Sequence, residues 1–92
     1  MAHIPAPLLA LAKVRSDICD VTLGTREHLQ TPLHTHPTTN HVVVTEGTLY
    51  LTLEGVETAV RPGDWRTIPS GKEHAERFEE ATSVVVFWVR PA

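Results

Sequence analysis

The stretch HVVVTEGTLYLTL, residues 41–53, decides the fold class of this chain. Its first part is rich in β-branched residues, and its second part alternates apolar and polar side chains with the period of two that is typical of a strand. Glu46 and Gly47 separate the two runs. The pattern therefore predicts two strands joined as a β-hairpin by a glycine-containing turn.

Working outward from this stretch, short apolar runs separated by Pro and Gly continue along the chain. Turns at intervals of about 8–12 residues are typical of a sandwich or barrel, so we expect an all-β domain. Residues 7–15 fit either a helix or a leading strand. Further strands are predicted at residues 18–23, 56–60, 65–68 and 83–89, with either a strand or a turn at residues 72–78.

Size and composition predict one folded domain over residues 1–92, in which residues 1–15 form an N-terminal segment, a strand or an arm at a dimer interface. A net charge of −3 and a pI near 6.0 argue against nucleic acid as a partner. No apolar run is long enough to span a bilayer, so no membrane association is expected. The run at residues 83–89 is apolar on both faces, which favours a homodimer that covers both sides of the sheet.

The location expected for this chain is cytoplasmic. Residues 1–12 begin without Lys or Arg and lack the long apolar middle of a secretion signal. Cys19 is the only cysteine, which fits a reducing compartment, and its place in an alternating run predicts a small buried side chain.

Six histidines occur in the 92 residues, and His34 and His36 form a His-x-His pair. On a strand, side chains at positions i and i+2 point to the same face, so the two imidazoles could chelate a metal. The alternative interpretation is a pair of solvated histidines at a strand end, because the tripeptide is common.

A second group of residues favours the metal site. Gly63 is followed by Pro69, Gly71 and His74, while Gly47 follows the His-x-His pair. This arrangement resembles the cupin superfamily, whose two motifs are G-x5-H-x-H-x3,4-E-x6-G and G-x5-P-x-G-x2-H-x3-N. The spacing is similar to that of small single-domain bacterial members. The positions that match the two motifs are His34, His36, Gly47, Gly63, Pro69, Gly71 and His74.

The resemblance implies a double-stranded β-helix, or jelly roll, of the RmlC-like cupin type, with a divalent metal held by His34, His36 and His74. The sequence departs from the motifs at two positions. The metal-binding Glu is replaced by Asn40, or by His41 if the longer spacing applies, and the final Asn is replaced by Phe78, which we expect in the core. A site without the carboxylate favours Fe, Ni, Cu or Zn over Mn.

The resulting hypothesis is a small metal-binding cupin that acts as a dioxygenase on a small organic substrate through a three-His site. Two alternatives remain open: a non-catalytic module that senses a small molecule or a metal, and a metal-dependent isomerase of a small polar compound. Glu76 shares the strand parity of His74 and could orient an imidazole or act as a base, or Glu73 and Glu76 are solvated surface acids. Trp65, Trp88 and Tyr50 are candidates for either pocket or core.

Overall fold

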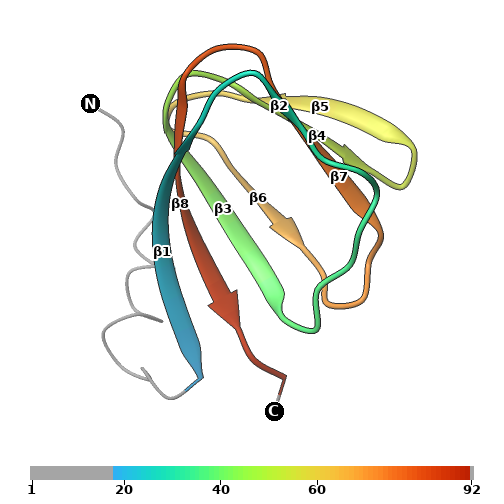
Figure 1. Ribbon diagram of the computed structural model, residues 1–92. Coiled ribbons are helices and arrows are strands. Elements are labelled where there is room, and N and C mark those ends of the chain that lie inside the picture. The colour runs from blue at the N-terminus through green and yellow to red at the C-terminus, as the bar shows by residue number, and fades with distance from the viewer. Residues whose placement is uncertain (1–17, 92) are drawn as a thin grey trace.

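The computed structural model describes residues 18–91, and every regular element in this range is an antiparallel strand (Figure 1). No helix capable of crossing a membrane occurs among these residues. The predicted N-terminal segment, residues 1–15, lies outside the described range. The strands are β1 (Cys19–Arg26), β2 (Leu29–Gln30), β3 (Thr39–Glu46), β4 (Leu49–Leu53), β5 (Val56–Val60), β6 (Trp65–Ile68), β7 (His74–Phe78) and β8 (Thr82–Val89).

The strands form two four-stranded sheets with the orders β1-β8-β3-β6 and β2-β7-β4-β5. Figure 1 shows the first sheet at the lower left and the second at the upper right. Apolar side chains from both sheets pack together between them, as the alternating sequence pattern requires. The all-β jelly-roll prediction is confirmed. The buried residues of this core are Val42, Val44, Leu49, Leu51, Val60, Ile68 and Phe78.

The hairpin predicted from residues 41–53 is wrong. β3 pairs with β6 and β8, whereas β4 pairs with β5 and β7 in the other sheet. Gly47, at φ +77°, carries the chain from one sheet to the other. The hairpin that does form joins β4 to β5 through Glu54 and Gly55, whose φ values of 53° and 77° are those of a two-residue type I′ turn.

β8 is apolar on both faces because its two faces contact different clusters. Val84 and Val86 pack against the core between the sheets. Val85 and Phe87 point the other way and join Cys19 and Val43 in a second buried cluster. Cys19 is therefore the small buried residue predicted from the sequence, and burial raises the pKa of its thiol.

Candidate metal centre

β7 carries three side chains into the space between the sheets, since His74, Glu76 and Phe78 alternate along it. His74 is fully buried, and Phe78 is 5% exposed within the core cluster. The prediction that Phe78 packs in the core is confirmed. Glu76 shares the inward face of His74, as strand parity predicted.

His34 and His36 come from the loop between β2 and β3, not from the strand that the His-x-His pattern predicted. The loop is instead held by backbone hydrogen bonds to the second motif. His34 and His74 exchange both of their backbone bonds, each at 2.9 Å, in an isolated antiparallel bridge. Gly71 N–H donates to the carbonyl of His36 at 2.8 Å. This cross-loop pairing, and not strand periodicity, places both imidazoles beside His74.

The three histidines form one compact cluster. One ring nitrogen from each of His34, His36 and His74 lies within 4.8 Å of the others. The ring centroids are 4.2 Å apart for His34 and His74, 4.9 Å for His34 and His36, and 5.0 Å for His36 and His74. Residues forty positions apart in the sequence thus meet at a distance that a single metal ion can bridge.

Hydrogen bonds orient two of these rings. His34 Nδ1 lies 2.8 Å from the carbonyl oxygen of Pro32, and His74 Nδ1 lies 3.0 Å from that of Lys72. A carbonyl oxygen only accepts, so each Nδ1 carries a hydrogen, and in the neutral imidazole each Nε2 then presents a lone pair. Metal-binding imidazoles are oriented in this way in proteins.

His74 Nε2 is a buried side-chain nitrogen that has no hydrogen-bond partner within residues 18–91. Leaving a polar atom unpaired inside a protein costs free energy, so a native structure normally gives it a partner. A metal ion bound to this lone pair would supply one. The donor set therefore fits a divalent transition metal.

The two candidates for the fourth ligand lie on opposite faces of β3. Asn40 is 3% exposed and faces the cavity between the sheets. His41 points to the outer face, where its Nδ1 lies 2.9 Å from the hydroxyl of Thr67 and its ring contacts Trp65. His41 therefore does not reach the histidine cluster.

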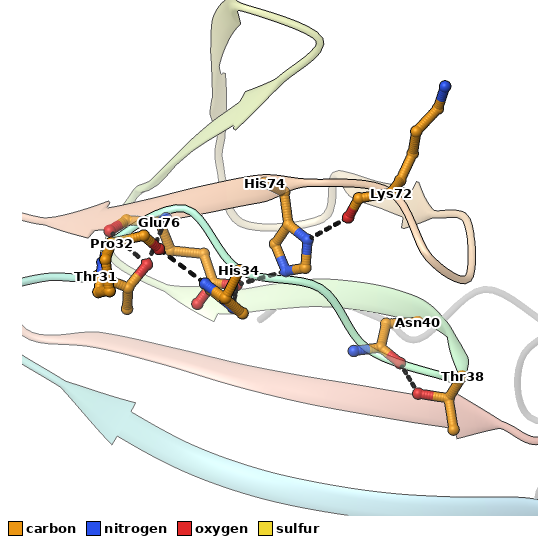
Figure 2. Close-up of polar contacts among 8 residues, drawn as sticks. All are labelled: Thr31, Pro32, His34, Thr38, Asn40, Lys72, His74 and Glu76. Carbon is orange, nitrogen blue, oxygen red and sulfur yellow. Dashed lines mark hydrogen bonds and ion pairs between the residues drawn. The ribbon is translucent and has the colours of Figure 1, made fainter.

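The side chain of Asn40 is held by a neighbour. Thr38 Oγ1 donates to Asn40 Oδ1 at 2.6 Å, and the amide nitrogen points away from Thr38 (Figure 2). The oxygen that would bind a metal is thus already a hydrogen-bond acceptor, and the free end of the amide is a donor. Such a group suits a bound molecule with an acceptor atom better than it suits a metal.

His34 and His36 line a cavity of about 380 Å³. Its walls are mostly apolar, and Trp88 forms part of them, with its ring 5.2 Å from that of His36 and its Nε1–H donating to Thr22 Oγ1. A largely apolar pocket with a few convergent polar groups is the usual form of a small-molecule site. Its lining includes Leu29, Val42, Leu49, Ile68, Phe78, Val84, Val86 and Trp88, with Thr22, Arg26, Thr31, His34, His36, Asn40 and Glu76 as the polar side chains.

The other residues considered from the sequence lie away from this cavity. Trp65 is on the outer face near His41, and the guanidinium of Arg77 lies 4.2 Å above the ring of Tyr50. Sequence reasoning missed Thr31 and Thr38, which fix Glu76 and Asn40. Thr38 lies two residues from Asn40, a local spacing that could have been noticed, whereas nothing local links Thr31 to Glu76.

Metal binding should weaken in acid. Burial lowers the pKa of His36 below its ordinary value of 6.5, and the neighbouring His74 and His34 lower it further. The negative charge of Glu76 opposes this shift. His36 thus stays unprotonated, and able to bind a metal, down to a lower pH than an ordinary imidazole. At still lower pH protons compete with the metal. We expect zinc to be retained on dialysis at pH 7.5 and released at pH 5. Unchanged retention at pH 5 would contradict a histidine-only site.

The chain was compared with known proteins. The cupin-domain profile matches residues 22–90. No match was found among curated protein sequences. Among solved structures, a cupin-2 domain protein from Shewanella frigidimarina is 24% identical, with a TM-score of 0.73 over 80% of this chain and 72% of that one.

Two larger proteins share the same fold. The EutQ protein of Clostridium difficile is 15% identical, with a TM-score of 0.75 over 82% of this chain and 59% of EutQ. The DMSP lyase DddQ from Ruegeria pomeroyi is 26% identical, with a TM-score of 0.72 over 79% of this chain and 39% of the lyase. With a jelly roll, a three-histidine cluster and a profile match over most of its length, the chain belongs to the cupin-domain family.

Proposed function

We propose that this cupin binds one divalent transition metal through His34, His36 and His74 and acts on a small, largely apolar molecule in the adjoining cavity. The observation that supports this most is the fully buried His74 Nε2, which has no hydrogen-bond partner among the described residues, on a ring that lies beside two further imidazoles. When bound there, the ion would supply a Lewis acid and, if it is iron, a centre at which O₂ reacts.

The lining of the cavity suggests the class of substrate. Apolar walls select a hydrophobic body, and a volume of about 380 Å³ limits it to a small molecule. The substrate's oxygen-bearing end would point toward the metal that the three histidines would hold, because such an ion binds oxygen donors. Arg26 lines the same cavity and favours a negatively charged or oxygen-rich substituent. A short organic acid or ketone with an apolar body meets these conditions.

Dioxygenation is the reaction we place first. Three protein imidazoles leave coordination positions for other ligands, and the cavity adjoins them. In a dioxygenation both atoms of O₂ enter the organic substrate, which supplies the electrons, so no separate reductant is required. Asn40, with its oxygen held by Thr38, would donate its amide hydrogen to the substrate and orient it.

The test uses iron-loaded protein and a panel of small apolar acids and ketones. We expect one compound to bind and to consume O₂. Val86→Phe should fill the cavity and abolish both responses while leaving the metal content unchanged. Val56→Phe is the matched control, since Val56 is 59% exposed and lies outside the cavity.

Other results would change the proposal. Binding without turnover would favour a non-catalytic sensing module, and conversion without O₂ uptake would favour an isomerase. If Val86→Phe binds and turns over the same compound as the wild-type protein, the cavity is not the substrate site.

The homodimer expected from the sequence stays a prediction. The edge strand β1 supports it, because Val21 and Leu23 on this strand are 40% and 80% exposed. Exposed apolar residues on a sheet edge favour pairing with another chain. A monomeric mass in solution would contradict it.

A further inference from the structure

We propose that the Glu76 carboxylate is the fourth protein ligand of the metal, taking the role that the first cupin motif gives to a glutamate on another strand. The inference rests on the proposed three-histidine centre and extends it. The carboxylate ligand would then come from β7, whereas the first cupin motif places it on β3.

The distances place Glu76 beside two of the three histidines. Its Oε1 lies 3.3 Å from His74 Nε2 and 3.6 Å from His34 Nε2, and both contacts are drawn in Figure 2. Zinc–nitrogen and zinc–oxygen bonds of about 2.0–2.1 Å at tetrahedral angles separate neighbouring ligand atoms by roughly 3.3 Å. The carboxylate oxygen and the two nitrogens are therefore spaced as ligands of one ion.

The chemistry of these atoms calls for a cation. The Nδ1–H groups of His34 and His74 face carbonyl oxygens, so in the neutral form of these rings both Nε2 atoms present lone pairs toward Glu76. A carboxylate oxygen is also an acceptor, so three acceptors meet with no donor among them. Like partial charges at this distance repel unless a positive ion lies between them. A divalent metal would satisfy all three atoms and the buried Nε2 of His74.

Backbone contacts hold Glu76 in this position. Thr31 N–H donates to the Glu76 carbonyl at 2.9 Å, and Glu76 N–H donates to Thr31 Oγ1 at 2.9 Å. The Glu76 side chain is 24% exposed and lines the cavity. Thr31 belongs to the same loop as His34, so one loop positions the histidine and the carboxylate together.

The position of Asn40 fits this assignment. Its oxygen accepts from Thr38 and its amide nitrogen points away from Thr38. With the carboxylate supplied from β7, the β3 position no longer has to bind the metal. It becomes free to contact the substrate, which a glutamate ligand there could not do.

The experiment measures Co²⁺ affinity and the visible spectrum of the bound Co²⁺ for wild-type protein and Glu76→Gln. We expect the dissociation constant to rise by about 10- to 100-fold in Glu76→Gln, with a changed spectrum, because one oxygen ligand is lost. Glu73→Gln is the matched control: it removes the same charge three residues earlier, at an exposed position outside the cavity. It should leave both readouts unchanged.

A second variant separates ligation from a merely structural effect. In Glu76→Gln/Asn40→Glu, the carboxylate returns to the β3 position, and we expect the affinity for Co²⁺ to recover. The thermal midpoint of metal-free Glu76→Gln should not fall below that of the metal-free wild type, since the variant removes a repulsive contact. A lower midpoint with unchanged Co²⁺ affinity would overturn the assignment.

The outcomes distinguish this inference from the proposed function. If wild-type protein binds Co²⁺ and Glu76→Gln binds it equally well with the same spectrum, the Glu76 assignment fails and the three-histidine centre stands. If wild-type protein takes up no Co²⁺, Zn²⁺ or Fe²⁺, both proposals fail.

Discussion

His74→Ala should remove the bound metal almost completely, lowering metal affinity by at least about 100-fold. Loss of a group that only orients a ligand already costs about 10- to 100-fold, and His74 is placed as a ligand itself. Its ring is fully buried, its Nδ1 is fixed by the carbonyl oxygen of Lys72, and its Nε2 has no hydrogen-bond partner within residues 18–91. Elemental analysis of protein purified without an affinity tag, together with zinc titration, measures the effect.

His41→Ala is the control for this prediction. It deletes an imidazole on the outer face of β3, where His41 contacts Thr67 and Trp65. Metal content should stay at the wild-type level in this variant, and circular dichroism should show that both variants fold. Full metal content in His74→Ala, or metal loss in His41→Ala, would show that the cluster is not the metal site.

Gly47→Ala should be the most destabilising single-methyl substitution that we predict. A Cβ at this position would lie 2.5 Å from Thr82 Oγ1 and 2.8 Å from Thr82 Cα, and closer still to the carbonyl oxygen of Ala81. The residue also has φ +77°, which L side chains rarely adopt. Together the clash and the strain should cost about 3–5 kcal/mol of unfolding free energy. For a domain of this size that corresponds to a fall of roughly 12–30 °C in Tm.

Gly55→Ala separates the two causes. Gly55 has the same φ of +77°, but a Cβ there meets nothing within 4 Å. The Gly55→Ala variant should lose only the unfolding free energy that comes from the strained backbone conformation, about 1 kcal/mol. Thermal and urea unfolding of both variants give the comparison. Equal losses would mean that the close approach of Ala81 and Thr82 does not determine the glycine at position 47.

The glycine matters because it lies where the chain changes sheets. Thr82, buried at the start of β8, accepts a hydrogen bond from Thr48 N–H and donates to the Thr48 carbonyl or the Glu80 carbonyl. A side chain at Gly47 would displace this contact. The glycine that the sequence analysis assigned to a hairpin turn is therefore required for a different reason, because the chain crosses there from one sheet to the other.

Much of the fold could be predicted from the sequence because strand alternation is a local property. The run at residues 48–53 alternates in the structure as it does in the sequence, and residues 83–89 lie within β8 with opposite faces in two clusters. The two-residue strand β2 (Leu29–Gln30) was missed, since two residues carry no period. It exists because it pairs with Arg77 and Phe78 of β7.

For the candidate site, the sequence predicted the residues but not how they are positioned. The spacing of His34, His36 and His74 in the sequence identified three residues that the structure brings together. The strand geometry invoked for His34 and His36 was wrong, because their loop is placed by hydrogen bonds to residues about forty positions away. The sequence left Asn40 and His41 as alternatives, and the structure places Asn40 on the inward face of β3 and His41 on the outer face.

The sequence by itself determined the all-β class, the longer strands and, through the spacing of the two motifs, the three histidines, because strand periodicity and motif spacing are visible along the chain without knowledge of its fold. Only the tertiary structure decided that β3 and β4 belong to different sheets and that Glu76 lies 3.3 Å from His74 Nε2. Strand partners and the meeting of side chains depend on backbone hydrogen bonds and packing between distant segments, and no local pattern records these.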